Sequence, residues 1–392
     1  MTQEPRGSDR RAVIVGAGVA GLTAALALRQ RGWQVEVLER APGIEPAGSG
    51  LSLWPNGLRG LDAIGVGPAV REQALSATEG GMRDTSGRWL TRIDIADLRH
   101  RYGDLVMIHR TALSGILRTA LGAEHLRPGT LVRAVEPAGR TVRVEHDHGS
   151  SDADLVLGAD GINSTVRAAL WPDAAEPVYA GYTAWRAIVT PAVPVRSGGE
   201  TLGRGARFGI APMHDGRVYW FAAANTPAGQ QSSEGELTAL RARFRDWHDP
   251  IPALLDAAEP DAVLHHDIYE LPPLRTYVRS RVALLGDAAH AMTPNLGQGA
   301  NLAIEDASTL AAMLDRIPEI PAALAEYDRI RRARVEPLRR LSRRMGVALQ
   351  LPWAPAVALR NTVLRLAPGG AALRALGPVL SWEPPDDPGR PR

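Results

Sequence analysis

Three glycines near the start of the chain have the spacing of a phosphate-binding turn. Gly16, Gly18 and Gly21 follow the apolar run Ala12–Val15 and lead into the Ala- and Leu-rich stretch Val19–Arg31. In such a strand–turn–helix unit the first glycine permits the tight turn, the second lets the backbone approach a pyrophosphate, and the third allows close helix–strand packing. The phosphate then faces the positive end of the helix dipole. The pattern predicts a dinucleotide-binding unit.

An acidic residue stands where such a unit needs one. Gln34–Leu38 is expected to form the next strand, and Glu39 follows 18 residues after Gly21. A carboxylate there would accept hydrogen bonds from ribose hydroxyls, and Arg40 would contact the adenine side. The alternative is a glycine-rich turn on a purely structural βαβ unit.

A second motif follows the apolar strand predicted over Asp154–Gly158. It delivers Asp160-Gly161 to a turn, with Ser164 and Arg167 as further polar groups. An ordinary strand-to-helix turn is an equally good interpretation of this motif alone.

A third motif follows the predicted strand Val282–Leu285. It begins with Gly286-Asp287 and continues through a Pro- and Gly-containing loop into a helix. Gly297 and Gly299 leave backbone N–H groups exposed at the helix start, where they suit an anion or a developing negative charge. The alternative is a capped helix after a loop.

The segments between these motifs are expected to alternate in type. Helices are predicted over Pro55–Ala63 and Arg110–Leu121, and strand hairpins over Leu75–Ile95 and Leu131–His146. Aromatic-bearing strands dominate from Val178 to about His266. Because this β-rich stretch lies between nucleotide-binding signals, the chain is predicted to be an interleaved α/β protein.

Composition narrows the function further. The chain has 392 residues, 45% of them hydrophobic and 22% charged, with a net charge of +2. A net charge so close to zero does not indicate a protein that binds nucleic acid. Cysteine and lysine are absent, which excludes disulfides, thiol nucleophiles and Schiff-base lysines. No apolar run is long enough for a transmembrane helix, so a cytoplasmic location is expected. His265 and His266 could supply two metal ligands, but the sequence shows no pattern for a third ligand, so no metal is expected.

Taken in this order, the three motifs resemble the flavin-dependent aromatic hydroxylases of the p-hydroxybenzoate hydroxylase type. The resemblance extends from about Ala12 to Pro352 and is closest to the branch with salicylate, 3-hydroxybenzoate and urate hydroxylases and zeaxanthin epoxidase. Four further segments match it: Gly48–Asn56, His109–Leu113, Gly181–Arg186 and Gly205–Pro212.

The resemblance implies a Rossmann-like FAD-binding domain interleaved with a β-sheet substrate domain, followed by C-terminal helices. The implied segments are 1–74, 105–177 and 278–345 for the FAD domain, 75–104 and 178–277 for the substrate domain, and 346–392 for the helices and a disordered tail. FAD would be held without a covalent bond by Gly16, Gly18, Ala20, Gly21, Glu39, Arg40, Gly50, Arg110, Asp160, Gly286, Asp287, Pro294, Gly297, Gly299, Ala300 and Asn301.

The chemistry implied by the resemblance is oxygen transfer. NADPH or NADH reduces FAD, O2 forms a flavin C4a-hydroperoxide, and one oxygen atom passes to a phenolic or polycyclic aromatic substrate. Epoxidation of an alkene, a reductase or dehydrogenase without oxygen transfer, and a non-enzymatic nucleotide-binding module remain alternatives. A flavin halogenase is excluded because its relay lysine is missing.

Candidates for the catalytic site are less specific. Pro294 matches a family position near the reactive flavin edge, or it merely stiffens the loop. Gln298 would face the substrate or cap the helix. Arg207 and Tyr219 would bind an anionic or phenolic group, or lie on the outer face of their sheet. Trp185, Trp220 and Phe221 are interpreted as core, the alternative being stacking on a substrate ring. His290 is interpreted as a buried, satisfied histidine, the alternative being a proton shuttle.

The C-terminal part is expected to consist of arginine-rich helices over Ala323–Leu366, interrupted at Pro337. They are expected to pack across the back of the FAD domain; the alternative is a basic helix on a membrane surface. No stable membrane insertion is expected, and the protein is expected to be a monomer or homodimer. Residues 1–11 are expected to fray, and the Pro-rich tail Glu383–Arg392 to be disordered.

Overall fold

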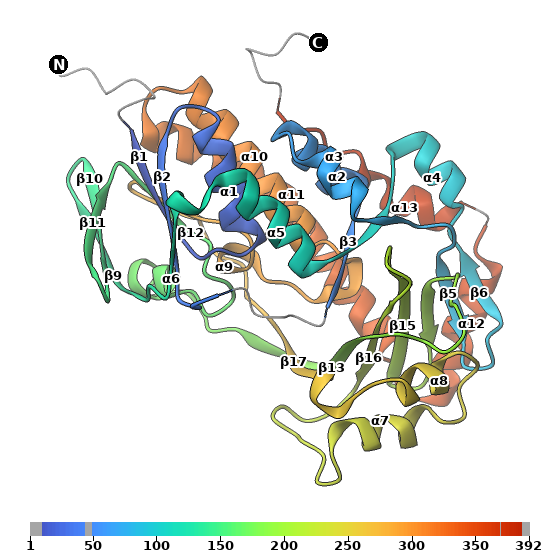
Figure 1. Cartoon of the computed structure of the whole chain (residues 1–392). Helices are drawn as coiled ribbons and strands as arrows, with labels where there is room; N and C mark the ends of the chain where they lie inside the picture. Colours follow the sequence, from blue (N-terminus) through green and yellow to red (C-terminus); the bar gives the residue numbers. More distant parts are fainter. Residues whose placement is uncertain (1–9, 44–48, 369, 386–392) are drawn as a thin grey trace.

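The computed structural model describes residues 10–43, 49–368 and 370–385 and contains two large sheets (Figure 1). The predicted disorder at the termini falls mainly on residues 1–9 and 386–392, which lie outside the described residues. Arg11, expected to fray, begins the first strand. Among the described residues, no helix is long and apolar enough to cross a membrane.

The first sheet carries all three glycine-containing motifs. Its six strands run in the order β18-β19-β12-β1-β2-β8 and are parallel except for β18 with β19. Their bounds are β1 Arg11–Val15, β2 Gln34–Glu39, β8 Leu126–Pro128, β12 Leu155–Gly158, β18 Val278–Arg279 and β19 Val282–Leu284. The strands β1, β12 and β19 are almost wholly apolar and buried, as strands covered on both faces must be.

Helices and a meander cover this sheet. Helix α1 (Val19–Arg29) packs against α5 (Arg110–Leu121) and α10 (Gly299–Arg316). Short helix α6 (Thr165–Leu170) packs on a three-stranded antiparallel meander. The meander consists of β9 Val132–Ala138, β10 Thr141–His146 and β11 Gly149–Ala153. The hairpin predicted over Leu131–His146 is thus confirmed, with a third strand added.

The second sheet has seven strands in the order β17-β13-β16-β15-β14-β5-β6. Their bounds are β5 Gly81–Asp84, β6 Trp89–Arg92, β13 Val178–Val189, β14 Gly199–Leu202, β15 Ala206–Pro212, β16 Val218–Ala224 and β17 Leu264–Glu270. One face packs against α7 (Glu236–Phe244) and α8 (Ile251–Asp256), two helices that the β-rich prediction for this stretch missed. The opposite face is turned toward the rest of the molecule (Figure 1).

A small sheet in the order β3-β7-β4 lies between these parts. Its strands are β3 Gly50–Leu53, β7 Val106–His109 and β4 Leu75–Ser76, and the neighbouring helices are α2 Pro55–Ala63, α3 Gly67–Glu72 and α4 Ile95–Tyr102. The bounds of α2 and α5 agree with the prediction. Helix α4 was not predicted; Asp94 begins it by accepting a hydrogen bond from the N–H of Asp97.

The chain ends in helices, as predicted, but Pro337 does not interrupt them. The short helix α9 (Asp287–His290) precedes α10, and α11 runs unbroken over Ile320–Leu349. Proline inside a helix removes one hydrogen bond and costs about 3 kcal/mol. Val335 and Leu338, on either side of Pro337, are buried in an apolar cluster with Leu302, and this packing keeps the helix continuous. Two shorter helices follow, α12 Ala354–Leu366 and α13 Ala371–Leu380.

Candidate functional site

The three glycine-containing motifs meet at one edge of the six-stranded sheet. Strands β1, β12 and β19 are parallel neighbours, so their carboxyl ends lie side by side. A Cβ on Gly16 would stand 2.4 Å from the carbonyl oxygen of Ala159, and one on Gly286 would stand 3.1 Å from the Cβ of Ala20. Ligands of open α/β sheets bind at this edge. The contacts therefore join the motifs into one candidate site.

Each glycine of the first motif has a distinct role. Gly16 has a φ of +103°, and a Cβ on Gly21 would stand 1.9 Å from the carbonyl oxygen of Gly16. Gly18 is different, because a Cβ there would meet no described atom within 4 Å apart from its chain neighbours and its own helix. Gly18 is also the N-cap residue of α1, and no side-chain cap is found there among the described residues. The start of α1 thus has open space beside Gly18, and the first N–H groups of a helix suit a phosphate.

Glu39 lies at the end of β2, beside this turn. Its carboxylate accepts hydrogen bonds from the backbone N–H of Ala17 at 2.7 Å and of Ala41 at 2.9 Å. These bonds fix the carboxylate at the edge of the turn, with further lone pairs for a ribose. Arg40 is exposed next to it.

Asp160 lies in the turn before α6, and its hydrogen bonds go to the start of that helix. Its carboxylate accepts from the hydroxyl of Ser164 at 2.5 Å and from the N–H of Val166 at 3.1 Å. Burial raises its pKa despite these bonds. Arg167 reaches the third motif by donating to the carbonyl of Ala288 at 3.0 Å. The second motif therefore orders the site edge, and a direct role of Asp160 toward nucleotides stays a prediction.

The third motif places an exposed carboxylate above a buried ionic cluster. Asp287 is exposed at the start of α9. Beneath it, Asp306 accepts from the backbone N–H of Gly286 at 2.8 Å and pairs with His290 at 2.7 Å and Arg331 at 2.7 Å. Burial alone would raise the pKa of Asp306, but His290 and Arg331 lower it to about 2. His290 is buried and hydrogen-bonded, as predicted.

The loop before α10 presents Pro294 and Gly297 on the surface, with Gly297 at a φ of +61°. A Cβ on Gly299, at the start of α10, would meet no described atom within 4 Å beyond its chain neighbours and its own helix. Ala300 follows in the first turn and is half-buried. As at Gly18, a helix start with free N–H groups faces open space.

Asn301 and Gln298 are committed to protein contacts. The amide of Asn301 donates to the carbonyls of Ser52 and Gly297 and accepts from the N–H of Trp54, which fastens β3 to α10. Gln298 makes no side-chain cap; its amide oxygen accepts from Asn56 at 2.9 Å. Any cofactor contact of Asn301 is left to its backbone.

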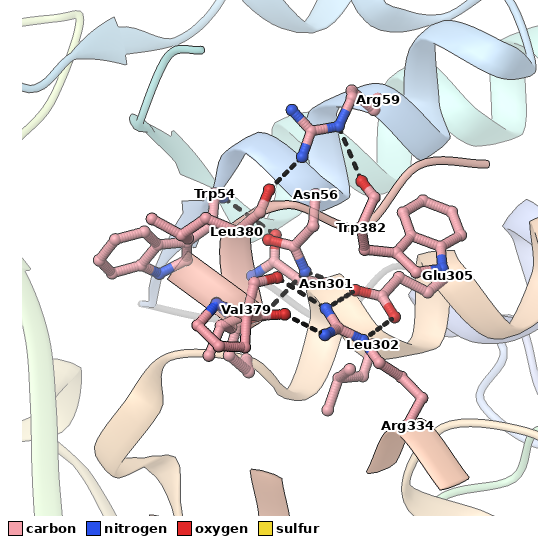
Figure 2. Close-up of polar contacts among 12 residues, drawn as sticks. Trp54, Asn56, Arg59, Asn301, Leu302, Glu305, Arg334, Val379, Leu380 and Trp382 are labelled. Carbon is pink, nitrogen blue, oxygen red and sulfur yellow. Dashed lines mark hydrogen bonds and ion pairs between the residues drawn. The ribbon is translucent and has the colours of Figure 1, made fainter. Parts of the chain in front are cut away.

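Asn56 connects this region to a larger polar network (Figure 2). It also donates to the fully buried Glu305 at 2.7 Å. Glu305 pairs with Arg331 at 2.8 Å and Arg334 at 3.0 Å. Arg334 and Arg59 donate to backbone carbonyls at and just after the end of α13, at Pro378, Val379, Leu380 and Trp382. The helix start at Gly299 is thus connected to the C-terminal helix by a chain of polar contacts, which is buried at Asn56 and Glu305.

The seven-stranded sheet turns a polar face toward this edge. Trp185, Phe208 and Trp220 point to the helix-covered side, so the alternating positions Arg186, Arg207 and Tyr219 lie on the opposite face. The interpretation of Trp185 and Trp220 as core is confirmed.

Tyr219 lies at the boundary between the two parts of the molecule. A Cβ on Gly50 would stand 2.7 Å from its ring, so the start of β3 touches the tyrosine directly. Burial raises the pKa of Tyr219, while a hydrogen bond with Arg186 and the charge of Arg110 oppose the rise. The hydroxyl therefore stays protonated near neutral pH. Arg110, the first residue of α5, is exposed.

Arg207 is buried and spans the same boundary. It pairs with Glu200 at 3.0 Å and donates to the side-chain oxygen of Asn295 at 2.5 Å. Asn295 also accepts from Tyr182 and donates to the carbonyl of Ser342 in α11. Among the described residues the Nε of Arg207 has no hydrogen-bond partner. A buried, unpaired N–H on a cation is a strong donor for a ligand oxygen.

Phe221 and the histidine pair complete this sheet. Phe221 is half-buried on the polar face, and Arg207 lies 5.9 Å from its ring centre, so its interpretation as core holds only in part. His265 stacks on Trp185 with ring centres 5.3 Å apart, whereas His266 is exposed. Over the described residues no cluster of potential metal ligands is found.

Sequence reasoning gave no role to Asn295, Asn56 or Glu200. Asn295 directly follows Pro294 in the third motif, but its partners lie far away in the sequence. Arg186, on the neighbouring strand, forms a hydrogen bond with Tyr219. Side chains alternate between the two faces of a strand, so the pairing of β13 with β16 places Arg186 and Tyr219 on the same face.

Comparison with known proteins supplies what the geometry leaves open. The family described as "FAD binding domain" matches residues 9–342. Aurachin C monooxygenase/isomerase of Stigmatella aurantiaca is 36% identical, covering 90% of this chain and 93% of its own length. The 3-amino-4-hydroxybenzoate 2-monooxygenase of Streptomyces cremeus is 35% identical, covering 91% and 92%. HpxO of Klebsiella pneumoniae, solved with FAD and uric acid, has a TM-score of 0.86 at 30% identity, covering 95% of this chain and 96% of that one.

Proposed function

Because the chain belongs to the FAD-binding family of flavin monooxygenases, we propose that it hydroxylates an aromatic substrate with NAD(P)H and O2. It is an FAD-dependent monooxygenase, and the relatives confirm the resemblance found in the sequence. The proposed substrate site is the space between the flavin and the polar face of the seven-stranded sheet. The observation that carries the proposal is the unpaired, buried N–H of Arg207 on that face.

The residues at the sheet edge fit FAD. Two open helix starts, at Gly18 and Gly299, have room where a Cβ would stand. We assign the pyrophosphate to the start of α1 and the pyrimidine edge of the flavin to the start of α10. Glu39 would hold the ribose, and the exposed Asp287 a ribityl hydroxyl. When bound, FAD supplies the hydride acceptance and oxygen activation of the family.

The polar face supplies hydrogen-bond donors to the substrate. Tyr219 is held protonated by burial and lies against Gly50, at the start of β3. Arg186 adds positive charge beside it, and the Nε of Arg207 adds a second donor. Donors and cations together lower the pKa of a bound phenol, which makes its ring more nucleophilic. These groups therefore favour a phenolic or anionic aromatic compound.

The loop at Pro294 would then work as a positioning element. Asn295 ties it to Arg207 on one side and to α11 on the other. Such a link fixes the distance between the sheet that holds the substrate and the helix start that would hold the flavin. Gln298 and Asn301 contribute by ordering the same segment.

The test is aerobic NAD(P)H oxidation with phenols, hydroxybenzoates, quinolones and polycyclic aromatics, each paired with its O-methylated analogue. We expect free phenols to accelerate oxidation and to gain the mass of one oxygen atom, and the methylated analogues to be poor. Acceleration without an oxygenated product would indicate a reductase or dehydrogenase. Oxygenation of alkenes alone would indicate an epoxidase.

A further inference from the structure

Helix α12 exposes the apolar side chains that a soluble helix normally buries. Leu359, Val363 and Leu366 are 66%, 59% and 77% exposed. Their spacing places them on one face of the helix. Arg360, off this face, is buried and donates to the carbonyls of Leu349 at 2.9 Å and Gly203 at 3.1 Å. The helix is therefore fixed to the protein by Arg360, while Leu359, Val363 and Leu366 face outward.

This apolar surface extends beyond the helix. Trp353, directly before α12, is 67% exposed, and Val347 near the end of α11 is also 67% exposed. Within the described ranges nine large hydrophobic residues are exposed, and six of them lie between positions 341 and 366. Single exposed hydrophobic residues need no explanation, but a cluster marks an interaction surface. In Figure 1, α12 lies beside β5 and β6, at the outer edge of the seven-stranded sheet.

The same stretch is strongly basic. Residues 337–382 contain seven arginines and no aspartate or glutamate, although the whole chain has a net charge of only +2. Arg343 pairs with Glu270 at 3.0 Å, and Arg365 with Asp84. The side chain of Arg343 stays 65% exposed and that of Arg365 40% exposed, and Arg344 is exposed as well. Exposed apolar side chains, a tryptophan and arginines without intervening acids are typical of helices that lie in a lipid interface.

We propose that the surface formed by Trp353, Leu359, Val363 and Leu366 docks peripherally on an anionic lipid bilayer. The apolar side chains would enter the headgroup boundary, while the neighbouring arginines would bind lipid phosphates. A second copy of the chain fits this surface less well. A two-fold interface would bring the arginines of both copies together without an acidic partner in this stretch.

The experiment uses the full-length, FAD-loaded protein and sedimentation with vesicles. One set contains phosphatidylcholine with phosphatidylglycerol, and the other phosphatidylcholine alone. The main variant carries Leu359→Ser, Val363→Ser and Leu366→Ser. Val193→Ser is the matched control, because Val193 is 74% exposed outside this surface. Arg344→Gln tests the contribution of charge.

We expect binding to anionic vesicles at least tenfold tighter than to neutral ones. The triple variant should lose roughly 100-fold in affinity, and Arg344→Gln about fivefold. Val193→Ser should bind like the unchanged protein. All variants should keep their flavin and thermal unfolding temperature, which shows that a loss concerns the surface and not the fold.

Three results would overturn the proposal. One is the absence of binding to either set of vesicles. Another is equal binding by the triple variant and the unchanged protein. The third is a dimer in light scattering that the triple variant dissociates, which would assign the surface to a second copy. None of these results bears on the proposed oxygenation, which is measured separately with water-soluble substrates.

Discussion

Replacing Gly18 by alanine separates the fold from cofactor binding. Gly18 has a φ of −74° and a ψ of −177°, which alanine adopts freely, and a Cβ there would meet no described atom within 4 Å apart from its chain neighbours and its own helix. The substitution should therefore change the free energy of unfolding of the flavin-free protein by less than about 0.5 kcal/mol.

The effect on FAD should be much larger. If the pyrophosphate approaches the backbone at Gly18, the added methyl group displaces it from the first N–H groups of α1. Losing one hydrogen bond to a charged group costs about 1.5–3 kcal/mol. This corresponds to a Kd for FAD that is roughly 10- to 150-fold higher.

The assay is fluorescence titration of flavin-free protein with FAD, beside urea unfolding of the same samples. Gly115→Ala is the matched control, because Gly115 lies in α5 with similar open space around its Cβ. It should leave the Kd unchanged. An unchanged Kd in Gly18→Ala, or an equal loss in Gly115→Ala, would refute the assignment of the open space to the cofactor.

Three further predictions concern the other groups. Asp287→Ala should weaken FAD retention, and a variant that stays fully yellow after gel filtration would contradict the role given to Asp287. Arg207→Gln should lower the fraction of NAD(P)H oxidation that yields hydroxylated product, measured as product against peroxide, because it removes the charge beside Glu200 and the link to Asn295. Acid should destabilise the fold through Asp306, whose pKa falls from 3.8 to about 2 in the folded protein. A carboxyl group whose pKa is lowered by folding stabilises the folded protein at pH values above its pKa in the unfolded chain. The free energy of unfolding should therefore fall by about 2.5 kcal/mol as the pH falls from about 5 through 2. In Asp306→Asn, denaturant unfolding should show that part of the pH dependence missing.

The local structure near the motifs could be predicted because it depends on local rules. The helices over Pro55–Ala63 and Arg110–Leu121 have the expected bounds. The strands before the glycines of all three motifs are short, apolar and buried, and parallel strands must bring their carboxyl ends together. The edge of the sheet where FAD would bind could therefore be located before any coordinates.

The substrate side could not be predicted in the same way. The pairing of Arg207 with Asn295 joins residues 88 positions apart, and no local pattern gives the register between their elements. The alternation of side chains along a strand places Arg207 and Tyr219 on the face opposite Phe208 and Trp220. It does not tell which of the two faces the helices cover. The part-buried contacts of Arg334 and Arg59 with the end of α13 likewise depend on tertiary packing.

Pro337 shows where a local rule fails. The propensity of proline predicts a break, but the surrounding turns of α11 bury Val335 and Leu338 and hold Arg331 in its pairs with Glu305 and Asp306. Packing on this scale outweighs the lost backbone hydrogen bond.

The most direct test of the central claim is to run the reaction of enzyme, substrate and NAD(P)H under isotopically labelled O2 and to measure the mass of the product by mass spectrometry. A phenol that accelerates NAD(P)H oxidation should acquire one heavy oxygen atom, and the label should be absent when heavy water replaces the heavy gas. A product that takes its oxygen from water, or oxidation that forms only peroxide with every aromatic tested, would contradict the assignment of this chain as an aromatic hydroxylase.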